Sequence, residues 1–67
     1  MSILVNGEPT ETSARSIAEL VRDVLGDRSM DGVAVAVGDV VVPRAQWAER
    51  ALLDGDRVEI IRAVGGG

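Results

Sequence analysis

The chain has 67 residues, 46% of them hydrophobic, so we expect one small globular domain rather than a disordered segment. It contains neither Cys nor His, which excludes disulfides, thiolate nucleophiles and the usual general base of neutral pH from its side chains. The formal net charge of -4 disfavours nucleic acid as a partner and favours a protein with a basic docking face.

The first segments predict a β-hairpin. Residues 2–6 alternate apolar side chains between two faces of a strand, with Leu4 on the face opposite its apolar neighbours. Asn6-Gly7 is a strong signal for a type I′ turn, in which both residues take positive φ. The return strand, about residues 8–12, is polar. Because Pro9 cannot donate to a ladder, we expect this strand at a sheet edge.

An amphipathic helix follows. Ser16 and Glu19 fit a capping box. In this motif the serine oxygen accepts from the backbone N–H at N3, and the Glu19 carboxylate accepts from the backbone N–H of the serine. Gly26 is a suitable stop. The apolar side chains have helical spacing and predict one buried stripe of Ile17, Leu20, Val21, Val24 and Leu25.

The second half predicts three strands and an irregular segment. Residues 33–37 and 40–42 form strands joined by a turn, and Pro43 ends the second of them. Residues 44–53 suggest a helical turn or an irregular packed segment, in which we expect Trp47 to be a structural anchor rather than a docking residue.

A tight turn at residues 54–56 precedes the last strand, at 57–63. Asp54 and Asp56 are interpreted as turn residues rather than metal ligands, because no further ligands are apparent. In the last strand, we expect Val58 and Ile60 on one face and Ile61 on the other.

The order β-β-α-β-β-β predicts an α+β fold, with a mixed sheet of about five strands packed on one main helix. A right-handed crossover places the last strand parallel to the first in the sheet centre, which is the β-grasp architecture of ubiquitin-like proteins. We expect a domain at residues 1–64 and a flexible glycine tail at 65–67. A tail without side chains is able to thread a narrow channel and present the Gly67 carboxylate to another protein's active site.

Four segments occur in order along the chain: Asn6-Gly7, Pro43-Arg44-Ala45-Gln46-Trp47, Asp54-Gly55-Asp56 and Gly66-Gly67. On these segments the chain resembles the ThiS family of sulfur carrier proteins of thiamin biosynthesis, over essentially its whole length. A terminal Gly-Gly is shared with the small subunit of molybdopterin synthase and with ubiquitin-like modifiers. Gly65 departs from the family pattern, because relatives often carry a larger residue there.

The resemblance implies a carrier that partner enzymes act on, not an enzyme. An E1-like adenylyltransferase would use ATP to adenylate Gly67, and a persulfide donor of the cysteine desulfurase or rhodanese type would then yield a Gly67 thiocarboxylate. Thiazole synthase would accept the sulfur, with Gly65, Gly66 and Gly67 inside the partner's active site. No cofactor and no metal would be bound.

Exposed apolar side chains near the tail are candidates for docking. We expect Ile61 to contact the partner, with Leu4 and Val41 as possible neighbours. Arg44 either contacts the partner or pairs with a nearby carboxylate, and the sequence favours neither role over the other.

Three alternatives stay open for the function: another sulfur acceptor such as molybdopterin, a thio-modified metabolite, or a β-grasp module that binds without covalent chemistry. We expect the chain alone to be a monomer. We expect it in the cytoplasm, because no signal peptide and no membrane-spanning stretch is apparent.

Overall fold

The computed structural model describes residues 1–62. Residues 63–67, with the expected domain boundary and glycine tail, lie outside the described part. The elements follow the expected order, with one short 3-10 helix in the irregular segment. They are β1 (Ser2–Val5), β2 (Glu8–Glu11), α1 (Ile17–Leu25), β3 (Val33–Val37), β4 (Val40–Val41), η1 (Arg44–Gln46) and β5 (Arg57–Arg62).

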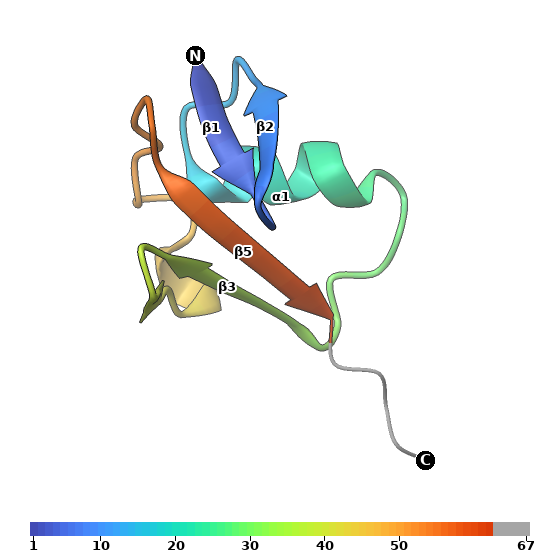
Figure 1. Cartoon of the computed structure of the whole chain (residues 1–67). Coiled ribbons are helices and arrows are strands. Elements are labelled where there is room, and N and C mark those ends of the chain that lie inside the picture. The colour runs from blue at the N-terminus through green and yellow to red at the C-terminus, as the bar shows by residue number, and fades with distance from the viewer. Residues whose placement is uncertain (63–67) are drawn as a thin grey trace.

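The five strands form one mixed sheet in the order β2-β1-β5-β3-β4. β5 is central and parallel to β1, while β3 is antiparallel to β5 on the other side. Helix α1 crosses behind the sheet and covers one face, as Figure 1 shows. This arrangement confirms the β-grasp fold. No helix within residues 1–62 is long and apolar enough to cross a membrane.

The first hairpin forms where the sequence predicts it. Asn6 and Gly7 have φ values of 50° and 83°, as a type I′ turn requires. β2 lies at the edge of the sheet, and Pro9 pairs opposite Leu4 within it. The missing N–H of proline therefore costs the sheet little.

Helix α1 begins at a serine cap, as predicted. The Ser16 Oγ accepts from the backbone N–H of Glu19 at 3.2 Å. The Glu19 carboxylate reaches further back than a standard capping box requires, and accepts from the N–H of Arg15 at 3.1 Å. Two carbonyls of the irregular segment complete the cap, because the Arg50 and Trp47 oxygens accept from the N–H groups of Ile17 and Ala18.

The core lies between α1 and the inner sheet face. Val24 corrects the predicted helix stripe: it is 43% exposed, whereas the other four members are buried. It lines a shallow groove beside the β1–β2 hairpin, where the sheet does not extend far enough to cover it. The buried residues are Ile3, Ala14, Ile17, Leu20, Val21, Leu25, Val35, Val37, Val42, Trp47, Leu52 and Val58.

Trp47 closes one end of this core. Its side chain is only 4% exposed, and the indole Nε1 donates to the Val42 carbonyl at 2.7 Å. The tryptophan thereby fixes the segment after β4, whose strand pairing stops at Val41. The structural interpretation of Trp47 is confirmed.

Candidate functional site

β5 is the last described element, and it directly precedes residues 63–67 in the sequence. It is longer than β1, and the two pair at only two positions, Leu4 with Arg57 and Val5 with Val58. β3 follows β5 further, as far as the pair of Val33 with Arg62. The last part of β5 therefore has a full partner strand on only one side.

The side chain of Asn6 occupies the other side of β5 beyond β1. Its Nδ2 donates to the Ile60 carbonyl at 3.2 Å, and its Oδ1 accepts from the Ile60 N–H at 2.9 Å. The side-chain amide thus replaces the peptide group that a longer β1 would supply. Sequence reasoning missed this role, because the Asn-Gly pair indicates only the turn.

The sheet face opposite α1 carries apolar side chains that are exposed or half-buried. Ile61 is 55% exposed and Val41 is 70% exposed, while Leu4 is half-buried. Paired residues point to the same face of a sheet, so the strand register places them together with two alanines, an arginine and a glutamate. We call this set the outer sheet face: Leu4, Ala34, Ala36, Val41, Arg57, Glu59 and Ile61.

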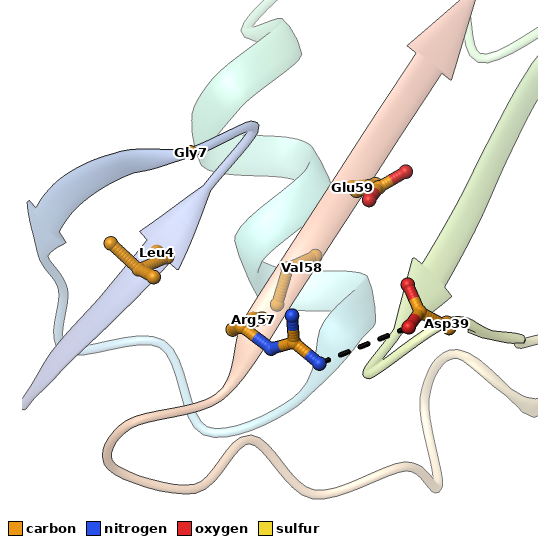
Figure 2. A pocket seen from close by; sticks show the side chains of 6 residues that line it. All are labelled: Leu4, Gly7, Asp39, Arg57, Val58 and Glu59. Atoms are coloured by element: carbon orange, nitrogen blue, oxygen red, sulfur yellow. Dashed lines mark ion pairs between the residues drawn. The ribbon is translucent and has the colours of Figure 1, made fainter.

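A shallow depression lies beside Leu4 on the same side of the sheet, with a volume of about 230 Å³. Figure 2 shows Arg57 and Glu59 of β5 at its margin, and the ion pair that links Arg57 to Asp39. The two charged groups are 3.9 Å apart and mostly exposed, so the pair contributes little to stability. The depression gives the outer sheet face a polar margin of both charges.

Arg44 lies in η1 and not in one of the strands that form the outer sheet face. Its guanidinium carbon is 6.0 Å from the centre of the Trp47 ring, at the limit of a cation–π contact. No carboxylate within residues 1–62 lies in ion-pair range of it. The structure therefore does not group Arg44 with the other three expected docking residues.

Asp54 and Asp56 hold the turn before β5. The Asp54 carboxylate accepts from the Ser2 N–H at 2.8 Å, and the Asp56 carboxylate accepts from the Leu53 N–H at 2.8 Å. Both side chains therefore act as turn residues, as expected, and Asp54 also fixes the start of β1.

Comparison with known proteins gives full-length matches. The model of the ThiS family matches residues 3–67. The sulfur carrier protein ThiS of Escherichia coli is 32% identical over 68 residues, which cover the whole of both chains. A crystal structure of the thiamine biosynthesis protein ThiS from Geobacter metallireducens superimposes with a TM-score of 0.80 at 30% identity, again over the whole of both chains. A thiazole synthase of Paramagnetospirillum magneticum is 36% identical over 69 residues, covering all of this chain but 20% of that protein.

Proposed function

Because the chain belongs to the ThiS family of sulfur carriers of thiamine biosynthesis, we propose that its reactive group is the Gly67 carboxylate, which receives and delivers sulfur. The observation that carries this proposal is the family match, which runs through residue 67 and so includes the terminal glycines. The absence of Cys, His and Lys agrees with it, since the serines and carboxylates of the chain form no recognisable pair of nucleophile and base in the sequence. Its partners supply the catalysis.

The proposed conversion of the Gly67 carboxylate to a thiocarboxylate has three steps: adenylation, sulfur transfer and reduction. An E1-like adenylyltransferase joins the Gly67 carboxylate to the AMP part of ATP and releases pyrophosphate. The terminal sulfur of a persulfide, held by a cysteine desulfurase or rhodanese-type donor, attacks the acyl carbon and displaces AMP. A thiol then reduces the sulfur–sulfur bond, which leaves the Gly67 thiocarboxylate and a disulfide. The activation is needed because a carboxylate ionised at neutral pH is a poor electrophile.

Thiazole synthase is the proposed acceptor enzyme. The thiazole synthase of P. magneticum contains, within one chain, a region similar to the whole of this protein. Fusion of a carrier to the enzyme that consumes its cargo raises the effective concentration of one for the other. This observation favours thiazole synthesis over molybdopterin or a thio-modified metabolite as the destination of the sulfur.

The carrier is proposed to be a monomer in the cytoplasm, where ATP is available to the adenylating enzyme.

The outer sheet face is the proposed docking surface for the adenylating enzyme. It combines exposed Ile61 and Val41 with half-buried Leu4, and Ile61 lies in the strand that leads to the tail. Small apolar patches with a polar margin are typical of partner sites. Arg44, which lies in η1, is a separate contact in this proposal.

Carrier-dependent exchange of pyrophosphate into ATP tests the first step. The intact chain should support exchange by the cognate E1-like enzyme, and removal of Gly67 should abolish it. Thermal stability should stay nearly unchanged in the shortened chain, because the buried core lies within residues 3–58. Exchange at the normal rate without Gly67 would contradict the assignment of the reactive carboxylate.

The variant Ile61→Asp tests the docking surface. It buries a charge in the contact with the partner but leaves the core untouched, so KM for the carrier should rise roughly ten-fold or more. Circular dichroism should show an unchanged fold. An unchanged KM would remove Ile61 from the docking surface while leaving the chemistry at Gly67 intact.

A further inference from the structure

The backbone of β5 alternates between its two neighbours. The carbonyls of Asp56 and Val58 face β1 and accept from the N–H groups of Leu4 and Asn6, each at 2.9 Å. Two residues further on, Ile60 faces the same side. Its N–H and its carbonyl are both taken by the side chain of Asn6, not by a strand.

This arrangement depends on the turn. Asn6 takes φ 50°, so its main chain leaves the sheet toward β2 at the point where β5 continues. The same left-handed conformation leaves the side chain against Ile60. One residue therefore ends the β1–β5 ladder and also caps it. Beyond this cap, the pairing with β3 and a hydrogen bond from the Arg62 guanidinium to the Ser29 carbonyl at 2.7 Å hold the strand.

We propose that Asn6 is a positioning residue for the reaction at Gly67. Its amide fixes the Ile60 peptide from the side that lacks a strand, and so holds the end of β5. β5 is the last described element before Gly67, so it is the last part of the domain whose position relative to a docked partner bears on the reacting carboxylate. The inference rests on the proposed function, but its structural part is measurable on the carrier alone.

The variant Asn6→Gly removes both hydrogen bonds and retains a residue that accepts positive φ, so the turn is preserved. Asn6→Asp keeps the acceptor but loses the donor. The matched control is Asp54→Ala, which removes one bond from a side chain to the backbone, that to Ser2, at the opposite end of β1. All three variants are compared with the intact chain for unfolding free energy, amide exchange and adenylation.

Amide hydrogen exchange on the free carrier is the first readout. In Asn6→Gly, exchange at Ile60, whose N–H donates to the Asn6 Oδ1, and at the next residue, Ile61, should accelerate about ten-fold relative to the buried residues Leu20 and Val21 of α1. Asp54→Ala should leave this ratio unchanged. A uniform acceleration over the whole domain would overturn the inference, because it would indicate a merely structural role.

Steady-state adenylation is the second readout. In Asn6→Gly, kcat should fall about three- to ten-fold and KM should change less than kcat, because Ile61 still pairs with Ala34 of β3 but fewer bound carriers present the carboxylate correctly. The kcat of Asn6→Asp should lie between those of Asn6→Gly and the intact chain. A normal kcat, or a loss confined to KM, would overturn the inference. If the intact chain itself is not adenylated, the proposed function fails, and the exchange ratio still decides whether Asn6 holds the end of β5.

Discussion

At the residue scale, Trp47 joins packing and hydrogen bonding in one side chain. Trp47→Phe removes the donor to the Val42 carbonyl and leaves a space in the core. The free energy of unfolding should fall by about 1–3 kcal/mol. Urea denaturation followed by circular dichroism measures this, because the variant loses the chain's single tryptophan fluorophore.

Arg44→Ala is the control for Trp47→Phe. It removes the exposed partner of the cation–π contact and should change the unfolding free energy by no more than about 0.5–1 kcal/mol. Equal losses in the two variants would contradict the assignment of the stabilising role to the buried indole.

Single residues also show where the sequence was informative. Asn6-Gly7 predicted its turn because turn chemistry is local, and Ser16 predicted the helix start for the same reason. The contact of Asn6 with Ile60 was not predictable, because it spans 54 positions and depends on the register of two strands. The hydrogen bond from the Arg15 N–H to Glu19 was not predictable either, and the irregular segment contacts the same residue, because the Leu52 N–H donates to the Arg15 carbonyl.

At the scale of elements, helix α1 shows that helical spacing alone does not decide which side chains are buried. Leu20 and Val24 belong to the same predicted stripe, but only Leu20 is buried. Leu20→Ala should cost about 2–5 kcal/mol of unfolding free energy, and Val24→Ala about 0.5 kcal/mol. Thermal or urea denaturation of both variants provides the comparison. Comparable losses would contradict the exposure of Val24.

Strand β4 offers a matched pair for the docking surface. Val40 and Val41 are adjacent and similarly exposed, at 66% and 70%, but point to opposite faces of the sheet. Val41→Asp places a charge on the outer sheet face and should raise KM for the adenylating enzyme several-fold. Val40→Asp should leave KM near its original value. The reverse order, or no difference, would show that the enzyme docks elsewhere.

The order and pairing of the elements were largely predictable. The polar β2 with its proline indicated an edge, and the crossover rule placed β5 beside β1. Val24 was the error, because helical spacing reports which residues share a face but not how far the sheet extends beneath them. The grouping of Leu4, Val41 and Ile61 followed from side-chain alternation, whereas Arg44 follows a turn whose direction no periodicity specifies.

At the scale of the whole molecule, the formal net charge of -4 should influence association. If the partner presents a basic face, the association rate should fall as salt rises, while the dissociation rate changes less. Stopped-flow or surface-based kinetics between low and physiological ionic strength measures both rates. An association rate independent of salt would contradict electrostatic steering.

The central claim is that the domain serves to deliver a reactive C-terminal carboxylate, and intact mass spectrometry tests it most directly. The carrier is incubated with ATP, its E1-like enzyme, a persulfide donor and a thiol, with ATP omitted in the control. The account predicts a mass gain equal to the replacement of one oxygen by one sulfur, localised to Gly67 by fragmentation. An unchanged mass, with the partner enzymes shown to be active on another carrier, would contradict it.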